Sequence, residues 1–302
     1  MRWAAHLRAL GHRVDVRVRW DGRDADALIA LHARRSHASM RAWRQRHPER
    51  PLVLVLTGTD LYRDIRRDAD ARASLALADR LVVLQERGPD ELAPEHRAKA
   101  VVIHQSVRSC RRREPPRGYF LATVIGHLRD EKDPFRAARA LALLPQSREL
   151  RVVQLGKAMS TDAAREARAL MRADPRYRWL GEIAHGRAMQ WLARSHLMII
   201  SSWMEGGAHV VSEAIAAGVP VVASDIPGNV GLLGADYPGY YAAGDERALA
   251  RLLLRAKSER AFLPLLAKKV KARRGLVSQA AERRALRELV AGLSRSGLSR
   301  ND

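Results

Sequence analysis

Two glutamates separated by a glycine pair carry the clearest chemical signal in the sequence. Glu205 is followed directly by Gly206 and Gly207, and Glu213 comes after seven intervening residues. Glycines just before a helix leave amide N–H groups uncovered at its positive end, which suits a phosphate or a sugar hydroxyl. The spacing predicts one carboxylate in the loop and the other about two turns into the helix, so both can face one cleft. Such a pair can also be structural or solvated, but the Ala-Gly-Val-Pro-Val-Val sequence at 217–222 makes the pattern more specific.

Alternating strand-like and helical segments predict a parallel sheet in the first half of the chain. The expected strands are residues 27–31, 51–56, 81–85 and 101–106. Polar residues follow the ends of these strands, where open α/β sheets bind ligands. The polar residues expected to line one crevice there are His32, Arg34, Arg35, Thr57, Thr59, Asp60 and Gln105. Any single one could instead be a capping or loop residue, so the set is stronger evidence than its members.

The first residues depart from this pattern. Residues 3–10 have the apolar spacing of a helix that ends at Gly11, and residues 14–18 alternate as a strand. A doubly wound domain normally opens with a strand and a glycine loop before such a helix. We therefore expect the first strand and loop of the N-terminal domain to be missing, on the side of the sheet where a ligand would bind.

An arginine-rich segment with two prolines, residues 108–118, predicts a linker between two domains. A second alternating series follows, with strands expected at residues 119–126, 151–156, 177–181 and 197–201. The expected fold class is therefore α/β, with two Rossmann-like domains facing a cleft. The expected domains are residues 1–116 and 117–302, with a last helix at about 279–294 packing back on the first domain.

Composition limits the classes of function. The chain has 302 residues and a net charge of +21, almost all from arginine because it has only seven lysines. This charge suits nucleic acid, a membrane surface or an anionic substrate, but the arginines are scattered and aromatic residues are few, which favours solvated helix faces. The single cysteine, Cys110, excludes an internal disulfide and a cysteine-rich metal site. No apolar run approaches a membrane span and no cleavage-type leader is present, so we expect a cytoplasmic protein.

Three motifs in order resemble the nucleotide-sugar domain of GT-B glycosyltransferases of the large family-4 type. They are the sequence Gly-His-Leu-Arg-Asp-Glu-Lys at 126–132, the segment 205–213 and the segment 217–222. The resemblance implies a UDP-sugar as co-substrate and no separate cofactor. It also implies that residues 117–302 hold the nucleotide-sugar donor and residues 1–116 hold the acceptor.

In that family a basic pair after the first strand of this domain holds the donor diphosphate, and the second glutamate binds ribose hydroxyls. Lys132 matches the family lysine, and Glu205 and Glu213 match the two glutamates. His127 stands where the family usually has arginine and Arg129 lies two residues later, so either could contact the phosphate. The resemblance thus implies catalytic roles for Lys132, Arg129, Glu205 and His127, and donor binding by Gly126, Gly206, Gly207, His209, Val210 and Glu213.

A metal site is the alternative way to stabilise a departing diphosphate. Two Asp-x-Asp sequences, at 24–26 and 68–70, could suggest the metal site of the other type of glycosyltransferase. The first leads into an expected strand and the second lies in a charged helix, so neither has the loop setting that such a site needs. We therefore expect metal-independent transfer, with no metal ligands.

The closest resemblance is to the selenosugar synthases of selenoneine biosynthesis. Residues 30–36, 56–65 and 126–135 carry it. These enzymes are thought to join selenophosphate to the anomeric carbon of UDP-N-acetylglucosamine. Thr57 stands where related enzymes often have a histidine that assists a hydroxyl acceptor, whereas selenophosphate is already an anionic nucleophile that needs cations. The expected acceptor-binding residues are His32, Arg34, Arg35, Thr57, Gly58, Asp60 and Arg63.

Two other functions compete with this interpretation. The first is an ordinary family-4 enzyme that transfers a sugar to a hydroxyl of a glycan or lipid, with peripheral membrane contact. The second is a basic protein without catalytic activity that binds nucleic acid through its arginines. The motif spacing disfavours the second, because nucleic-acid binding would leave that spacing unexplained. We expect no nucleic-acid partner and no transmembrane segment.

Overall fold

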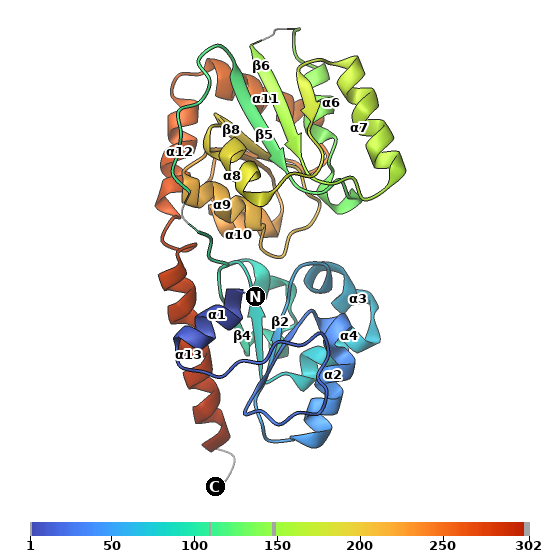
Figure 1. Ribbon diagram of the computed structural model, residues 1–302, viewed down its shortest axis with the longest axis vertical. Coiled ribbons are helices and arrows are strands. Elements are labelled where there is room, and N and C mark those ends of the chain that lie inside the picture. Colours follow the sequence, from blue (N-terminus) through green and yellow to red (C-terminus); the bar gives the residue numbers. More distant parts are fainter. Residues whose placement is uncertain (1, 109, 147–148, 299–302) are drawn as a thin grey trace. The chain divides into compact units, whose positions relative to one another are not determined.

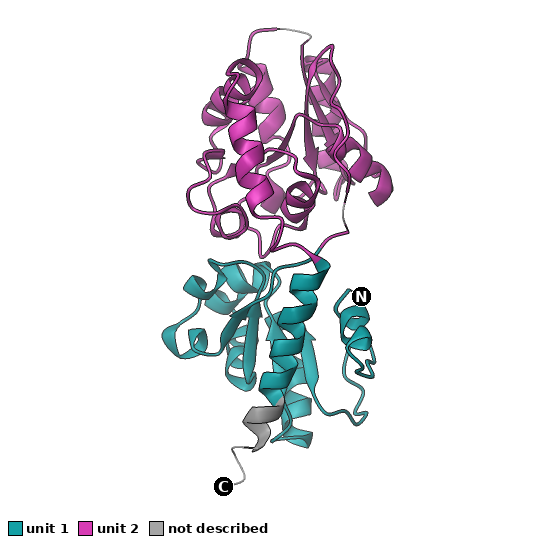
Figure 2. Ribbon diagram, turned by 90° about the vertical axis from the view of Figure 1, so that its left-hand side faces the viewer, with its two compact units in different colours: residues 1–106, 279–302 teal, residues 107–278 magenta. Residues whose placement is uncertain are grey.

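The computed structural model describes residues 2–108, 110–146 and 149–298, with side chains described up to residue 293. The chain divides into two compact units (Figure 2). The first contains the residues up to Ser106 and those from Gln279 onward, and the second contains Val107–Ser278. Each unit holds one parallel sheet with helices around it (Figure 1). The α/β class and the two Rossmann-like folds expected from the sequence are therefore confirmed.

The sheet of the first unit has four parallel strands in the order β1-β2-β3-β4. The strands are β1 Leu28–Leu31, β2 Leu52–Val55, β3 Arg80–Val83 and β4 Ala100–Val102. The helical elements of this unit are α1 Arg2–Ala9, α2 Ala33–Arg46, the π-helix η1 Asp60–Asp64, α3 Ile65–Arg67, α4 Ala69–Leu77, the 3-10 helix η2 Gly88–Glu91, α5 Pro94–Arg97 and α13 Gln279–Leu298. Each strand begins and ends within or close to a segment expected from the sequence.

Both faces of this sheet are buried. Leu52 and Leu54 of β2 pack on one face in a cluster that includes Trp43 of α2. Val53 and Val55 pack on the other face in a cluster that includes Leu289 of α13. Double burial explains why β2 is apolar at every position instead of alternating. Helix α13, from the far end of the sequence, therefore completes the core of the first unit.

The strand expected at residues 14–18 is wrong. Residues 12–27 contain no strand, although the alternation of valines there has the period of one. Val18 is fully exposed and Val16 is 44% exposed. Alternation stabilises a strand only when one face is covered and a neighbouring strand pairs with it. Val14 packs against the core, but the next two valines do not, and no neighbouring strand pairs with this segment.

The sheet of the second unit has six parallel strands in the order β10-β9-β8-β5-β6-β7. The strands are β5 Phe120–Ile125, β6 Leu150–Leu155, β7 Tyr177–Trp179, β8 Leu197–Ile200, β9 Val221–Ser224 and β10 Tyr240–Tyr241. The helices are the 3-10 helix η3 Asp130–Lys132, α6 Arg136–Ala142, α7 Thr161–Ala173, α8 His185–Ala193, α9 His209–Ala217, α10 Pro227–Leu233, α11 Glu246–Ser258 and α12 Phe262–Ala272. None of the described helices in either unit combines the length and apolar character needed to cross a membrane.

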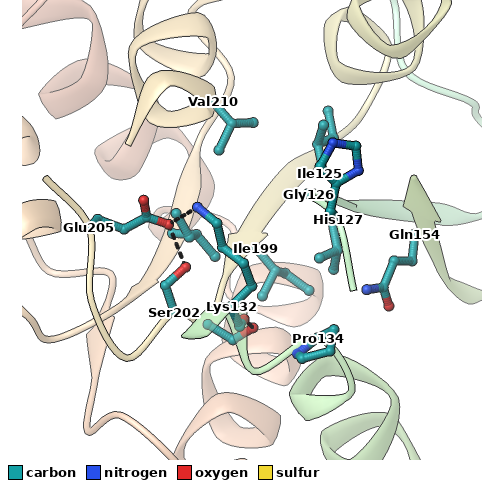
Figure 3. A pocket seen from close by; sticks show the side chains of 13 residues that line it. Ile125, Gly126, His127, Lys132, Pro134, Gln154, Ile199, Ser202, Glu205 and Val210 are labelled. Carbon is teal, nitrogen blue, oxygen red and sulfur yellow. Dashed lines mark hydrogen bonds and ion pairs between the residues drawn. The ribbon is translucent and has the colours of Figure 1, made fainter. Parts of the chain in front are cut away.

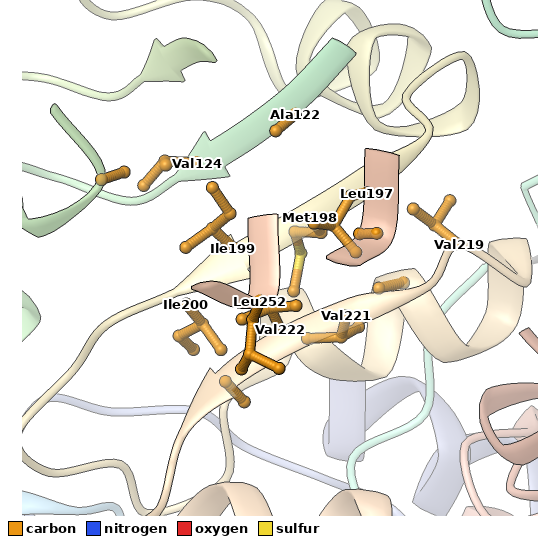
Figure 4. Packing of buried hydrophobic residues seen from close by; sticks show 14 of the residues in the cluster. Ala122, Val124, Leu197, Met198, Ile199, Ile200, Val219, Val221, Val222 and Leu252 are labelled. Atoms are coloured by element: carbon orange, nitrogen blue, oxygen red, sulfur yellow. The ribbon is translucent and has the colours of Figure 1, made fainter. Parts of the chain in front are cut away.

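Neighbouring strands β8 and β9 form the centre of the core of the second unit (Figure 4). Met198 and Ile199 of β8 are almost completely buried, as are Val221 and Val222 of β9. Burying one such side chain contributes roughly 1.5–3 kcal/mol. The strand ends of this sheet are thereby fixed in place, and the loops that follow β5 and β8 start from a rigid edge.

Candidate functional site

A pocket opens in the second unit at the carboxyl ends of β5 and β8 (Figure 3). It is lined by Val124, Ile125, Gly126, His127, Lys132, Pro134, Gln154, Ile199, Ile200, Ser201, Ser202, Glu205 and Val210. Five of these residues were expected from the sequence to bind a ligand: Gly126, His127, Lys132, Glu205 and Val210. The structure thus brings together side chains from the loop after β5, the loop after β8 and the first turn of α9.

An ion pair between Lys132 and Glu205 lies in this pocket (Figure 3). Lys132 Nζ donates to Glu205 Oε1 over 2.5 Å, and Ser202 Oγ donates to the same oxygen over 2.6 Å. The Glu205 side chain is 9% exposed and that of Lys132 is 27% exposed. A lysine ammonium carries three N–H groups and Glu205 takes one, so the pocket can present the others to an anion.

The loop that carries the lysine is tied to the end of β8. Ser201 Oγ donates to the carbonyl of Asp133 over 2.8 Å. The N–H of Trp203 donates to the carbonyl of Glu131 over 2.9 Å. Asp133 has a positive φ of 43°, and its carboxylate accepts a hydrogen bond of 2.7 Å from Arg136 Nε. A left-handed backbone at a residue other than glycine costs free energy and is found where a site needs that geometry.

Glu205 is held from the opposite side by a chain of buried polar groups. Ser224 Oγ donates to the carbonyl of Ser202 over 2.7 Å, and Asn229 Nδ2 donates to the carbonyl of Ser224 over 2.9 Å. Helix α10 also approaches Glu205 closely, because a Cβ added to Gly228 would lie 2.0 Å from the carbonyl oxygen of Glu205. The carboxylate therefore takes its position from β9 and α10 as well as from its own loop.

His127 reaches the pocket but Arg129 is not among the residues that line it. The N–H of Lys157 donates to His127 Nδ1 over 3.1 Å, so a neutral imidazole carries its proton on Nε2 and can donate it to a ligand. The loops after β5 and β6 touch at two glycines, since a Cβ on Gly156 would lie 2.0 Å from the carbonyl oxygen of Gly126. This contact fixes the start of the loop that bears His127.

The glycine pair before α9 does not use the left-handed backbone conformations that glycine enters readily. Neither Gly206 nor Gly207 has a positive φ, so the backbone there does not require glycine for its conformation. Gly206 is buried. Helix α9 begins at His209, and the Ala208 before it supplies no side-chain cap. The N–H of Val211 donates to the carbonyl of Ala208 over 2.8 Å, and the first turn carries the positive end of the helix dipole.

Glu213 lies in α9 outside the lining of the pocket, in a cluster with two histidines. His185 Nε2 is 2.6 Å from Glu213 Oε1, and His209 Nε2 is 3.5 Å from the same oxygen. The Glu213 side chain is 8% exposed, whereas that of His185 is 73% exposed.

The same carboxylate affects a thiol nearby. Burial raises the pKa of the Cys110 thiol; the Arg113 cation opposes this rise, and the Glu213 carboxylate adds to it.

A second polar cluster lies in the first unit, where β1 and β2 end. Asp60, which is fully buried, begins the π-helix η1. Its carboxylate accepts hydrogen bonds from the N–H groups of Thr57 (2.9 Å), Gly58 (2.8 Å) and Ala33 (3.0 Å). Asp60 is thus a backbone organiser that joins the loop after β2 to the start of α2. Its two oxygens are occupied by these contacts, so its expected part in ligand binding is indirect.

The other carboxylate of this cluster, Asp64, lies beside two arginines and a histidine. Arg34 Nε and Arg63 Nε donate to its two oxygens over 3.1 and 3.2 Å, and His32 Nε2 lies 3.8 Å away. His32 has a positive φ of 74°, and its Nε2 is 3.2 Å from Thr59 Oγ1. A strained histidine and a short π-helix side by side are features typical of functional sites. Asp64 thus faces two guanidinium groups, whereas the carboxylate of Asp60 is turned to backbone N–H groups.

Some predicted residues fall outside these clusters. The side chain of Arg35 is exposed, and Gln105, which is partly buried, makes none of the contacts of these clusters within the described part of the chain. The first Asp-x-Asp sequence supplies Asp24, which pairs with Arg50 over 2.5 Å, and the second supplies Asp68, which caps α4. Within residues 2–108, 110–146 and 149–298, no three or more histidine, cysteine, aspartate or glutamate side chains gather in a way that could hold a metal ion.

Sequence patterns did not single out three residues that the structure places at these sites. Ser202 shares Glu205 with the lysine, and His185 contacts Glu213 from another helix. Gln154 lines the pocket, and its Oε1 accepts a hydrogen bond of 2.6 Å from Tyr177. Ser202 could have been noticed from its position at a strand end, three residues before Glu205. The others depend on contacts between segments that are distant in the sequence.

Comparison with known proteins extends over both units. A family model described as Glycosyl transferases group 1 matches residues 108–274. Among curated proteins, none matches this chain. Anabaena HepE in complex with UDP superposes with a TM-score of 0.73 at 16% identity, over 88% of this chain and 79% of that protein. The same protein has also been solved with UDP-glucose.

Two further solved structures have a similar fold. Sucrose-phosphate synthase from Thermosynechococcus elongatus has a TM-score of 0.73 at 17% identity, over 90% of this chain and 74% of that protein. The UDP-forming alpha,alpha-trehalose-phosphate synthase of Burkholderia vietnamiensis has a TM-score of 0.71 at 14% identity, over 88% of this chain and 74% of that protein. At these identities the likeness concerns the fold, which is that of two Rossmann-like domains of the GT-B type.

Proposed function

The chain belongs to the group 1 glycosyl transferases, and on this premise we propose that it joins the sugar of UDP-N-acetylglucosamine to selenophosphate and releases UDP. The observation that carries the nucleotide-sugar half of this proposal is the pocket in which Lys132, Glu205 and His127 meet. The acceptor half rests on the cationic cluster around Asp64. In the proposed reaction the C1–O bond of the donor breaks, its electron pair leaves with UDP, and a C1–Se bond forms.

Departure of UDP develops negative charge on the diphosphate, which fixed positive groups must stabilise. Lys132 Nζ, the Nε2–H of His127 and the uncapped first turn of α9 supply such groups around one pocket. Glu205 keeps the lysine in place, and Glu213 accepts hydrogen bonds from the ribose hydroxyls of the nucleotide. Because cations and amides supply the charge, the proposed transfer is metal-independent and takes place without a further cofactor.

Selenophosphate needs a different environment from a hydroxyl acceptor. It is anionic and polarizable before it reacts, so cations that hold it matter more than a base that removes a proton. Arg34 and Arg63 both donate an Nε–H to Asp64, which brings two guanidinium groups to one place. Arg34 is the more accessible of the two, with 47% of its side chain exposed. We assign the binding of the selenophosphate oxygens to these arginines.

Transfer to a hydroxyl of a glycan or lipid is the second candidate, and one contact favours it. His32 Nε2 lies 3.8 Å from Asp64 Oδ2, and a histidine beside a carboxylate can accept a proton from a hydroxyl. The two candidates therefore use the same cluster in different ways. The first relies on the arginines and the second on the imidazole.

Release of UDP from UDP-N-acetylglucosamine, followed with different acceptors, tests the proposal. We expect UDP release to depend on selenophosphate and to be far slower with orthophosphate or with water. Arg34→Met should raise the KM for selenophosphate, whereas His32→Gln should leave it nearly unchanged. UDP release that requires a hydroxyl acceptor and ignores selenophosphate would favour the second candidate. No UDP release and no binding of UDP would exclude both.

A further inference from the structure

The environment of Glu213 contains a contact that the proposed function does not use. Glu213 lies on α9 and His185 lies in the first turn of α8, yet their side chains meet over 2.6 Å. A carboxylate can only accept a hydrogen bond, so His185 Nε2 must carry the proton in this contact. His209, one turn before Glu213 on its own helix, approaches the same oxygen at 3.5 Å. Both imidazoles therefore lie beside the same carboxylate oxygen of Glu213, Oε1.

The other oxygen of Glu213 is left for a ligand. In the described part of the chain, no hydrogen bond to Glu213 Oε2 is recorded, and this oxygen is not among the buried atoms that lack a partner. The carboxylate as a whole is largely buried, with 8% of the side chain exposed. A carboxylate with one oxygen engaged and the other open has a defined orientation, since rotation about its last bond would break the contact with His185.

We propose that His185 is a positioning residue. It holds the Glu213 carboxylate in the orientation needed to accept hydrogen bonds from the ribose hydroxyls of the nucleotide. The inference rests on the proposed function, because it assumes that Glu213 receives the ribose. A fixed acceptor binds a hydroxyl without first losing side-chain freedom, and this preorganisation increases affinity. His185 itself stays outside the nucleotide contact and acts through Glu213.

The local setting of His185 supports a role beyond its own helix. An imidazole in the first turn of a helix gains nothing from the helix dipole, which favours anions at that end. The side chain is 73% exposed, so solvent could satisfy its N–H without the contact to Glu213. The Glu213 carboxylate therefore explains why the His185 side chain points toward α9, since nothing in α8 requires that direction.

Binding of UDP and of 2′,3′-dideoxyuridine diphosphate to the intact chain, measured by calorimetry, tests this inference. His185→Phe keeps a ring and removes the donor, and His185→Gln keeps an N–H of similar reach. Gln190→Ala changes an exposed side chain on the same helix and serves as the matched control. A hydrogen bond to a charged group is worth about tenfold in affinity, so His185→Phe should weaken UDP binding by about that factor.

The dideoxy nucleotide separates positioning from a general structural effect. We expect His185→Phe to leave its affinity unchanged, His185→Gln to restore most of the UDP affinity, and Gln190→Ala to match the wild type. In kinetics the KM for the UDP-sugar should rise while kcat stays the same. Equal loss for both nucleotides, or no loss for either, would overturn the inference and leave the proposed function standing. A wild-type chain that binds no UDP would overturn both.

Discussion

At the scale of single residues, the pocket of the second unit depends on Lys132. Its ammonium group donates a hydrogen bond to Glu205, and the lysine lines the pocket. Glu205 is nearly buried and directs the Lys132 side chain, with Ser202 bound to the same carboxylate oxygen. The pair is thus suited to meet a diphosphate that gains charge as its bond to the sugar breaks.

Replacing Lys132 by methionine removes this charge and keeps the length of the side chain. We expect kcat/KM for the UDP-sugar to fall by about a hundredfold or more, in the range seen when one group that stabilises a transition state is lost. Steady-state rates of UDP release measure the effect. Lys268→Met, at an exposed position of α12, is the control and should behave as the wild type. A near-normal rate for Lys132→Met would show that the diphosphate binds elsewhere.

The sequence could predict some of these residues and not others. Lys132, Glu205 and Glu213 follow from motif spacing within short segments of chain. Whether His127 or Arg129 faces a ligand depends on the course of the loop, and the structure places His127 in the pocket. His185 meets Glu213 only because α8 and α9 pack together, which no local pattern encodes. The assigned roles of all these residues stay predictions until they are tested.

At the scale of elements, helix α10 sets the position of Glu205. A Cβ at Gly228 would lie 2.0 Å from the Glu205 carbonyl oxygen and 2.8 Å from its Cβ. Gly228→Ala should therefore displace either α10 or the Glu205 loop, lower kcat/KM at least tenfold and destabilise the chain by about 1–3 kcal/mol. Thermal unfolding and UDP release together measure both effects.

A glycine in another helix provides the control for this substitution. A Cβ added to Gly292 of α13 meets nothing within 4 Å, so Gly292→Ala should preserve activity and stabilise the helix by roughly 0.5–1 kcal/mol. If Gly228→Ala were as active and as stable as Gly292→Ala, the close approach of α10 to Glu205 would not matter for the site.

Strand β5 makes the stability of the second unit depend on pH. His196 Nδ1 accepts a hydrogen bond of 2.9 Å from the N–H of Leu121, which requires a neutral ring. Burial lowers the pKa of His196 below its ordinary value of 6.5, and the nearby Arg112 cation lowers it further. The unfolded chain therefore binds more protons between the folded pKa and 6.5, so stability is complete above 6.5 and falls as the pH drops below it.

Denaturant unfolding at several pH values between 5 and 8 measures this dependence. We expect the free energy of unfolding to decrease below pH 6.5 in the wild type. His196→Asn keeps an acceptor that does not titrate, so its curve should be flatter over the same range. Identical curves for the two proteins would mean that His196 does not contribute to acid sensitivity.

At the scale of the whole molecule, the α/β class and two parallel sheets could be predicted because strands and helices alternate so regularly. Strand β2, for example, is an unbroken apolar run that only a doubly covered sheet explains. Residues 14–18 form no strand, because no neighbouring strand pairs with them although their alternation matches one. The period of the apolar residues indicates which side chains could be buried. Whether a strand forms depends on its pairing with a neighbouring strand.

Glu282 connects the two ends of the chain within the first unit. Its buried carboxylate accepts hydrogen bonds from Arg2 Nε (2.9 Å), Trp3 Nε1 (2.7 Å) and the N–H of Ser106 (3.1 Å). It thereby joins α1, α13 and the last residue of the first unit before the chain enters the second. The C-terminal helix is held by this charge as well as by its apolar side chains.

Glu282→Ala should lower the free energy of unfolding by about 3–5 kcal/mol, because it leaves buried partners of a charged group unpaired. Tryptophan fluorescence reports the loss, since Trp3 contacts the carboxylate directly. We expect UDP binding to persist at temperatures below unfolding, because the proposed nucleotide residues belong to the second unit. A chain of unchanged stability would show that α1 and α13 do not depend on Glu282.

The mass spectrum of the product formed from UDP-N-acetylglucosamine and selenophosphate shows directly whether the protein makes a selenium-containing sugar. Selenium has a distinctive isotope pattern, so its attachment to the sugar can be recognised without a reference compound. We predict a product that contains N-acetylglucosamine and selenium, formed together with UDP and formed more slowly, by about a hundredfold or more, by the Lys132→Met variant. A reaction that yields UDP and an oxygen-linked sugar with no selenium in the product would contradict the account.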